Sequence, residues 1–191
     1  MNPVPVRVVV IDDDEDDYIL VADVLERIGD VRFMVSWSAT YADGLHKVNA
    51  GDGDVYLVDY LLGAYSGVEL IRAAVEGGNR APMILMTGQG NPEVDAAALS
   101  AGAADYLVKR DLDPERLSRA LRYAMDRARA YQAVEEGEAR YRLLFDRNPM
   151  PLWVYDIASL EFLEANEAMI DHYGYSRDEL SRMTALDIRP A

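Results

Sequence analysis

Five short apolar segments recur along the N-terminal part of the chain, each followed by a stretch long enough to form a helix. Short apolar runs bounded by polar residues or glycine are typical of strands that are buried on both faces of a sheet. The stretches between them repeat their apolar residues at helical spacing. This alternation predicts an α/β fold, in which helices cover both faces of a parallel sheet. The predicted strands are Val8–Ile11, Val31–Trp37, Val55–Val58, Met83–Met86 and Asp105–Val108.

The stretches between these strands carry signals for the start and the end of helices. The helix expected after the first strand ends at Gly29, because glycine favours the left-handed conformation that closes many helices. Asn91 and Pro92 are typical of an N-cap and a first helical position. In a sheet of this kind the reactive site lies beyond the carboxyl ends of the strands. The residues at those ends are therefore the candidates for chemistry.

Charged and hydroxyl side chains stand at the carboxyl ends of the predicted strands. Asp12 and Asp13 follow the first strand, Asp59 the third, Thr87 the fourth and Lys109 the fifth. Because parallel strands bring these ends to one edge, we expect the side chains to converge. A cluster of carboxylates favours a hard cation with oxygen ligands, above all Mg²⁺. A carboxylate can also attack phosphorus to form an aspartyl phosphate, while a hydroxyl and an ammonium hold the transferred oxygens.

The composition excludes several classes of function. The chain has 191 residues, no cysteine and a formal net charge of −15. The lack of cysteine excludes disulfides and thiolate metal sites, and the negative charge argues against a nucleic-acid partner. The N-terminus lacks the pattern of a signal peptide, and no apolar run is long enough to cross a membrane. We therefore expect a soluble, cytoplasmic protein without nucleic-acid or membrane partners.

The segments around these strand ends resemble the receiver domain of response regulators in two-component signalling. The motifs that carry the resemblance are "VVVIDDD", "VYLVDYLLGAYSGVELI", "PMILMTGQG" and "GAADYLVK". The resemblance implies a flavodoxin-like, doubly wound five-stranded parallel sheet of strand order 2-1-3-4-5. It implies a receiver domain over residues 1–127.

The resemblance also implies a metal site. Asp13 would bind Mg²⁺ directly, Asp12 would act beside it through water, and Asp59 would be both a ligand and the phosphoacceptor. The backbone carbonyl of Leu61 would complete the protein ligands. The family often has proline four residues after the phosphoacceptor, but this sequence has Gly63, which predicts a looser loop.

The same resemblance implies how the phosphoryl group is held and sensed. Thr87 and Lys109 would bind it, and Thr87 together with Tyr106 would form the switch. In the family a cis proline usually follows the lysine, but Arg110 follows here, so the bond between them is either trans or strained. The phosphoryl group would come from a histidine kinase or a phosphotransfer protein. The chain would then be a signalling module and not a metabolic enzyme.

Two alternative functions fit parts of this pattern. One is a pseudo-receiver, an interaction module that never takes up phosphate; the complete set of site residues argues against it. The other is a phosphatase of the haloacid dehalogenase type, which also begins with a strand followed by Asp-x-Asp, here Asp12 and Asp14. Asp16 stands where that family has threonine or valine, and Asp59 would have no role in it. The acids from Asp14 to Asp17 are interpreted as a solvated helix start.

A long helix is predicted from Pro114 onward, with Asp113 as its N-cap. Its apolar residues follow a heptad-like spacing that slips between Glu135 and Gly137. A single domain usually has helices of about twelve residues. We therefore interpret residues 113–147 as a linker that continues the last receiver helix and pairs as a coiled coil in a homodimer.

The rest of the chain resembles the first part of a PAS domain, a fold of the α+β class. The motifs are "RYRLLFDRNP", "GYSRDEL" and "DIRP", with strands expected at Leu152–Tyr155 and Leu160–Leu163 and a capping box at Ser176–Glu179. The segment 141–191 is short for such a fold, so we expect a truncated PAS domain and an output module beyond Ala191. The resemblance leaves its ligand open between haem, flavin and none; without cysteine, flavin–cysteine photochemistry is excluded.

Overall fold

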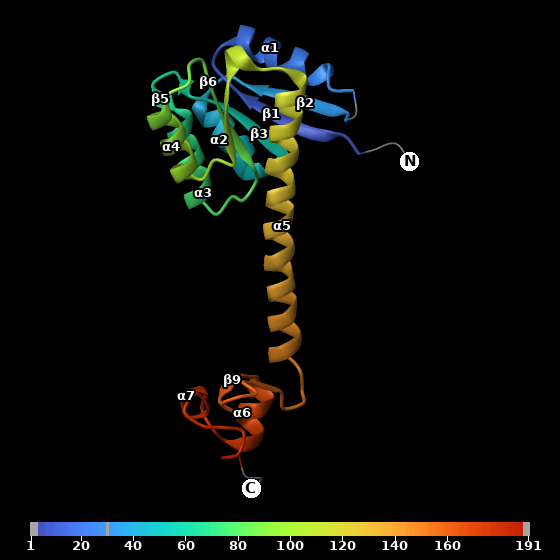
Figure 1. Cartoon of the computed structure of the whole chain (residues 1–191), viewed down its shortest axis with the longest axis vertical. Helices are drawn as coiled ribbons and strands as arrows, with labels where there is room; N and C mark the ends of the chain where they lie inside the picture. The colour runs from blue at the N-terminus through green and yellow to red at the C-terminus, as the bar shows by residue number, and fades with distance from the viewer. Residues whose placement is uncertain (1–3, 30, 189–191) are drawn as a thin grey trace. The chain divides into compact units, whose positions relative to one another are not determined.

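The computed structural model describes residues 4–29 and 31–188, and Figure 1 labels its helices and strands. The first and last residues of the predicted receiver and PAS segments, 1–3 and 189–191, lie outside this described part, and so does the end of the "DIRP" motif. None of the described helices combines the length and the apolar character that a membrane crossing requires.

The first of two compact units, Met1–Ala130, is built on a parallel sheet. Within the described residues this sheet has five strands in the order β2-β1-β3-β6-β7. Counted along the chain, that is the doubly wound order 2-1-3-4-5, so the predicted fold class is confirmed. The strands are β1 (Val6–Ile11), β2 (Phe33–Ser38), β3 (Val55–Asp59), β6 (Met83–Thr87) and β7 (Asp105–Val108).

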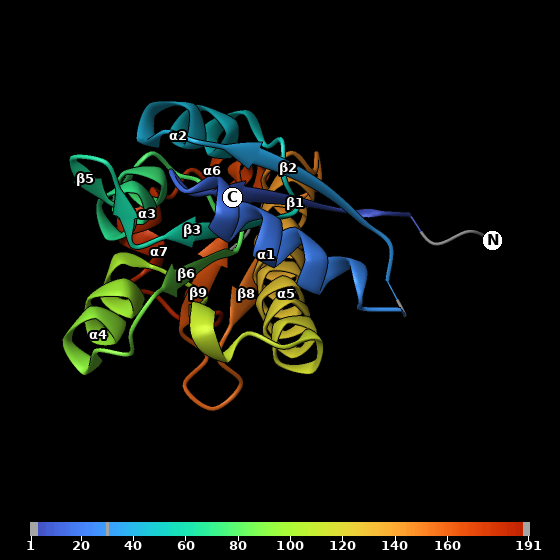
Figure 2. The same ribbon diagram turned by 90° about the horizontal axis from the view of Figure 1, so that it is seen from above.

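Helices cover both faces of this sheet (Figure 2). Val8 and Val10 of β1 pack into a cluster with α1 and α5, whereas Val9 and Ile11 pack into a cluster with α2, α3 and α4. Successive residues of a strand point to opposite faces, so a strand between two helical layers must be apolar at every position. The helices are α1 (Glu15–Glu26), α2 (Tyr41–Ala50), α3 (Gly67–Glu76), α4 (Pro92–Ala101) and α5 (Pro114–Asp146).

Two predicted boundaries on the way from β1 to β2 are wrong by a few residues. Helix α1 ends at Glu26 with Arg27 as its C-cap, and not at Gly29, because the N–H of Arg27 already closes the last turn onto the helix. Strand β2 begins at Phe33 and not at Val31, because its partner strand β1 begins opposite Phe33. Asn91 and Pro92, by contrast, open α4 as predicted.

A short antiparallel hairpin follows β3 directly. Its strands are β4 (Leu61–Leu62) and β5 (Tyr65–Ser66). Gly63, which was expected to loosen this loop, lies in the turn with φ of +62°, a conformation that favours glycine. Ser66 then caps α3 with a capping box that it forms with Glu69.

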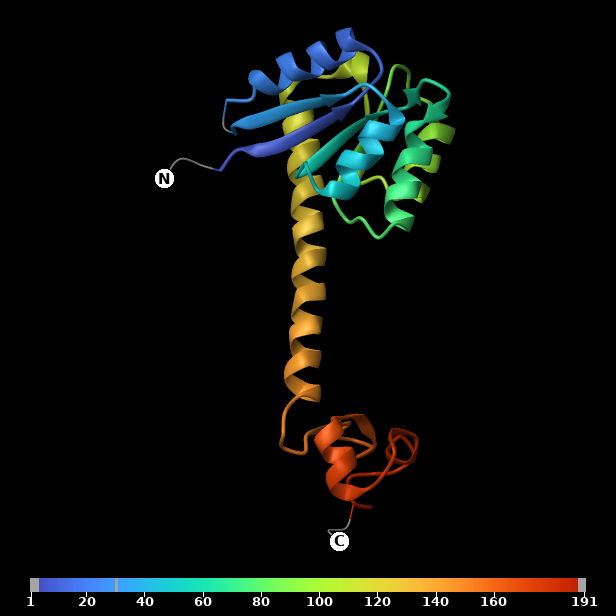
Figure 3. The same ribbon diagram turned by 180° about the vertical axis from the view of Figure 1, so that it is seen from behind.

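Helix α5 runs without interruption from Pro114 to Asp146 (Figure 3). The side chain of Asp113 accepts a hydrogen bond from the N–H of Arg116 at 2.9 Å, which confirms it as the N-cap. The slip in the apolar pattern around Gly137 does not break the helix. A glycine inside a helix destabilises it by only about 1 kcal/mol relative to alanine, which the adjoining turns can absorb.

The second compact unit, Tyr131–Ala191, contains the end of α5 and a small α+β segment. Its other elements are β8 (Trp153–Tyr155), β9 (Phe162–Ala165), α6 (Glu167–Tyr173) and α7 (Arg177–Leu180).

Strand β9 begins at Phe162, two positions later than predicted, because Leu160 still belongs to the turn: its N–H bonds to the carbonyl of Asp156 at 2.8 Å. The capping box of Ser176 and Glu179 is present as predicted.

Asn166, which is completely buried, ties the end of α5 to this segment. Its side-chain amide nitrogen donates to backbone carbonyls in the last turn of α5 and after it. Its side-chain oxygen accepts from backbone N–H groups that precede and follow Asn166 in the sequence. This side chain therefore fixes how the last turn of α5 joins the start of α6. The carbonyls are those of Phe145, Asn148 and Met150, and the N–H groups those of Leu152 and Met169.

Candidate functional site

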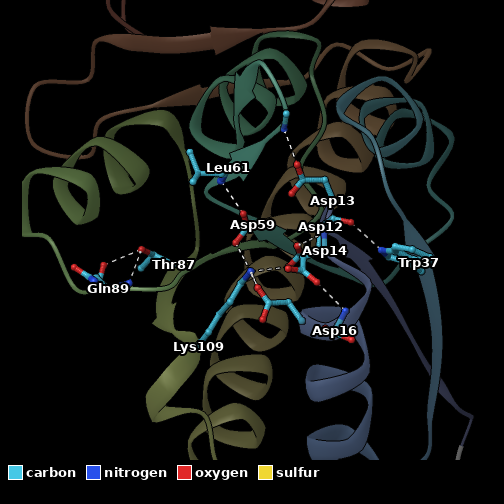
Figure 4. Close-up of polar contacts among 12 residues, drawn as sticks. Asp12, Asp13, Asp14, Asp16, Trp37, Asp59, Leu61, Thr87, Gln89 and Lys109 are labelled. Atoms are coloured by element: carbon cyan, nitrogen blue, oxygen red, sulfur yellow. Dashed lines mark hydrogen bonds and ion pairs between the residues drawn. The ribbon is translucent and has the colours of Figure 1, made fainter.

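Asp12, Asp13 and Asp59 come together at the carboxyl edge of the sheet (Figure 4). Each offers a carboxylate oxygen, and these oxygens lie within 4.8 Å of one another. Asp12 follows the last residue of β1, and Asp59 is the last residue of β3. Asp12 and Asp59 are buried and Asp13 is exposed, so the cluster is open to solvent on one side. A group of this kind can hold a divalent cation.

Lys109 points its ammonium group into this cluster from the end of β7. Its Nζ lies 2.8 Å from Asp12, 2.5 Å from Asp59 and 2.5 Å from Asp17. Burial alone would lower the pKa of Lys109, but the hydrogen bonds to these carboxylates together raise it above its ordinary value. The peptide bond between Lys109 and Arg110 is trans. Of the two possibilities that the sequence left open for this bond, the trans form is therefore the one present.

Burial raises the pKa of Asp12 to about 6, although Lys109 and the N–H of Asp14 both favour its charged form. The ammonium of Lys109 therefore compensates the buried carboxylate only in part. A divalent cation at this position would favour the charged form further. The residues present thus fit a bound Mg²⁺.

Backbone N–H groups of the β4–β5 hairpin bind the other two acids of the cluster. The N–H of Leu61 donates to Asp59 at 2.7 Å, and the N–H of Gly63 donates to Asp13 at 2.9 Å. The hairpin is therefore attached directly to the acid cluster. The role of the Leu61 carbonyl as a metal ligand stays a prediction.

Thr87 ends β6 and Tyr106 lies on β7, but neither joins the cluster of acids and lysine. The hydroxyl of Thr87 donates to the carbonyl of Gln89 at 2.8 Å, so it is turned onto its own loop (Figure 4). Tyr106 is partly buried on β7, where the charge of Asp95 on α4 and a hydrogen bond to it raise the pKa of the phenol. Their roles in binding and switching stay predictions.

Asp17 is a site residue that the sequence reasoning missed. The interpretation of Asp17 as part of a solvated helix start is wrong, because its carboxylate forms an ion pair with Lys109. A signal was present in the sequence. Asp17 stands four residues before Val21, a buried residue of α1, and residues four apart share one face of a helix.

Trp37 is a second residue beside the site that the sequence reasoning missed. Its indole N–H donates to the backbone carbonyl of Asp12 at 2.8 Å. Its ring stacks on Tyr18 of α1, with 5.2 Å between the ring centres. Trp37 thus supports the backbone of the acid cluster from the side of β2. No sequence motif singles it out, because the contact depends on tertiary packing.

Comparison with known proteins finds two families along this chain. The family model of the response regulator receiver domain matches residues 8–122, and that of the PAS domain matches residues 139–190. The chain is 28% identical over 156 residues to the two-component response regulator PhoP of Pseudomonas aeruginosa, covering 78% of this chain and 69% of PhoP. It is 41% identical over 63 residues to the response regulator RppA of Synechocystis, covering 33% of this chain and 27% of RppA.

A solved structure agrees with this assignment. The CheY-like response regulator receiver domain protein from Methanospirillum hungatei superposes with a TM-score of 0.58 at 25% identity, over 67% of this chain and 99% of that chain. The receiver family accounts for more than half of the present sequence, with a PAS match after it. On its fold and its sequence, the chain belongs to the response regulator receiver family of two-component signalling.

Proposed function

We propose that Asp59 accepts a phosphoryl group and that the chain uses it as a signal. The observation that carries the proposal is the meeting of Asp12, Asp13 and Asp59 with the ammonium of Lys109 at one sheet edge. A carboxylate oxygen of Asp59 forms a bond to phosphorus, while the bond from phosphorus to the histidine nitrogen of a kinase or phosphotransfer protein breaks. The nitrogen keeps the electron pair of that bond, so charge and atoms balance.

The other site residues would orient this reaction. Asp13, Asp12 through water, Asp59 and the carbonyl of Leu61 would hold Mg²⁺, which when bound neutralises charge on the phosphoryl oxygens. Lys109 would bind one phosphoryl oxygen. Thr87 would turn from Gln89 to bind another, which requires the breaking of its present hydrogen bond at 2.8 Å.

The movement of Thr87 would leave room for Tyr106 to turn inward, next to α4 and α5. Helix α5 would then relay the change to the PAS segment, to which Asn166 fastens its last turn. We also propose that α5 pairs with a second copy of the chain. This is supported by apolar side chains that α5 exposes along its length, at Tyr123, Val134 and Leu144.

Asp59→Asn is expected to abolish phosphorylation. With acetyl phosphate and Mg²⁺, the parent protein should gain one phosphoryl group that is stable to acid and labile to base, measured by intact mass. The amide that replaces the carboxylate in this variant is no nucleophile toward phosphorus. Asp52→Asn is the matched control, because Asp52 is an exposed acid just before the first residue of β3. This variant should be labelled like the parent.

The possible results separate the alternatives. Labelling of Asp59→Asn at the rate of the parent would contradict the assignment of the phosphoacceptor. A parent protein that takes no label would favour the pseudo-receiver. Continuous hydrolysis of phosphate esters that requires Asp12 and not Asp59 would favour the haloacid dehalogenase-type phosphatase.

Mg²⁺ is expected to raise the melting temperature of the parent protein. A ligand that binds only the folded state stabilises it by about 2.7 kcal/mol at a hundred times its dissociation constant. Asp13→Ala should lose most of this effect, whereas Asp16→Ala, which deletes an exposed acid of α1, should keep it. Thermal unfolding across a Mg²⁺ titration measures both. Identical curves for the parent and Asp13→Ala would argue against a metal site at these residues.

A further inference from the structure

Three carboxylates surround the ammonium group of Lys109 in the present arrangement. Among the described residues, its carboxylate partners are Asp12 at 2.8 Å, Asp17 at 2.5 Å and Asp59 at 2.5 Å. A lysine ammonium carries three hydrogens and can donate three hydrogen bonds. Two of these hydrogens bind the carboxylates of Asp12 and Asp17, so both carboxylates compete with a phosphoryl group on Asp59 for the ammonium of Lys109.

Asp17 is the partner that can be released most easily. The side chain of Asp12 is 1% exposed and that of Asp59 is 9% exposed, whereas that of Asp17 is 39% exposed. A carboxylate removed from a buried cation stays without solvation, but a half-exposed one is taken up by water. Asp17 also lies in the first turn of α1, where the helix dipole favours a negative charge.

We propose that Asp17 is a positioning residue that holds Lys109 in the unphosphorylated protein and yields it to the phosphoryl group on Asp59. The proposal rests on the proposed phosphorylation of Asp59. The carboxylate of Asp17 and a phosphoryl oxygen on Asp59 would compete for the same ammonium group. Asp17 lies outside the cluster of Asp12, Asp13 and Asp59 that could hold the metal. It therefore restrains the reaction through Lys109 and not through the metal.

The test is the rate at which Asp17→Asn is phosphorylated. Loss of a partly exposed ion pair that competes with the transition state should raise the rate constant with acetyl phosphate and Mg²⁺ by about threefold to tenfold. Beryllofluoride, an analogue of the phosphoryl group, should bind more tightly by a similar factor. Asp17→Glu keeps a carboxylate on the same helix face and should stay close to the parent in both measurements.

Asp16→Asn is the matched control. It removes the same charge from the same helix turn, but the side chain of Asp16 is exposed, and its backbone N–H donates to Asp14. If Asp16→Asn accelerates phosphorylation as much as Asp17→Asn, the effect is general repulsion of the anionic donor, and the proposal is wrong. Equal rates in the parent, Asp16→Asn and Asp17→Asn, with folding verified by thermal unfolding, would also overturn it. A parent protein that takes no label at Asp59 overturns the proposed function and this inference together.

Discussion

Gly67→Ala is expected to destabilise the receiver unit by about 3 kcal/mol or more and to impair phosphorylation of Asp59. A Cβ atom at Gly67, the first residue of α3, would lie 2.0 Å from the backbone oxygen of Asp59 and 3.0 Å from a side-chain carbon of Val58. The obstacle is backbone, so no rotamer change relieves it. The N–H of Gly67 also donates to the carbonyl of Tyr60 at 2.9 Å, so the start of α3 cannot move away without loss of this bond.

Gly137→Ala provides the control for this substitution. A Cβ atom at Gly137 meets nothing within 4 Å, and Gly137 lies inside α5. Alanine there should stabilise the helix by about 0.5–1 kcal/mol, because it restricts the unfolded chain. Urea unfolding followed by far-UV circular dichroism measures both variants. A Gly67→Ala protein within about 0.5 kcal/mol of the parent would show that α3 and β3 are not packed as described.

Lys109→Met is expected to lower the free energy of unfolding by about 3 kcal/mol or more in the absence of Mg²⁺. The substitution keeps much of the side-chain volume but leaves the buried carboxylates of Asp12 and Asp59 without their cation. Removal of one member of a buried ion pair is strongly destabilising, because the remaining charge has neither water nor a partner. Added Mg²⁺ should restore part of the stability, since it can compensate the same acids.

Lys47→Met is the control for the loss of a lysine. Lys47 is the other lysine of the chain, and its partners are the carbonyl of Trp37 and the carboxylate of Asp43, with 23% of its own side chain exposed. Its removal should destabilise the protein by only about 1 kcal/mol. Denaturant unfolding of the two variants at equal ionic strength compares them. Equal losses would mean that the acid cluster does not depend on Lys109.

The pH dependence of Lys109→Met gives a second check. The pKa of Asp12 is raised to about 6 in the folded protein, above the value of about 3.9 in an unfolded chain. The folded state therefore binds more protons, and this group makes stability fall as pH rises from about 4 to 6. Without Lys109 the pKa of Asp12 should rise further, so the decline continues to higher pH. The variant should then differ more from the parent at pH 8 than at pH 5.

The layered fold could be predicted because strands buried on both faces have a simple sequence pattern. Val8 to Ile11 are apolar without interruption since both faces of β1 are covered. The ends of elements were less predictable. The start of β2 at Phe33 is set by its pairing with β1, which the apolar Val31 does not reveal. The end of α1 at Glu26 is set by a local backbone hydrogen bond, which the position of Gly29 does not reveal.

The candidate site was predictable only to the level of strand ends. The topology of a parallel sheet suffices to place Asp12, Asp59 and Lys109 at one edge. The direction of each side chain is a tertiary property. Thr87 bonds to its own loop, and Asp17 reaches Lys109 from a helix whose acids look like an ordinary solvated start. The motif therefore identifies candidate members of the site but not the hydrogen bonds and ion pairs that they form in this structure.

Trp37, which stacks on Tyr18, is a natural fluorophore beside the acid cluster. The indole donates to the backbone carbonyl of Asp12, so a change of charge at the acid cluster acts on the fluorophore through a single peptide group. The chain has one other tryptophan, Trp153, in the second compact unit. With Trp153→Phe, the remaining tryptophan emission comes from Trp37 alone, so the proposed binding of a cation or a phosphoryl group can be tested in real time without any attached dye.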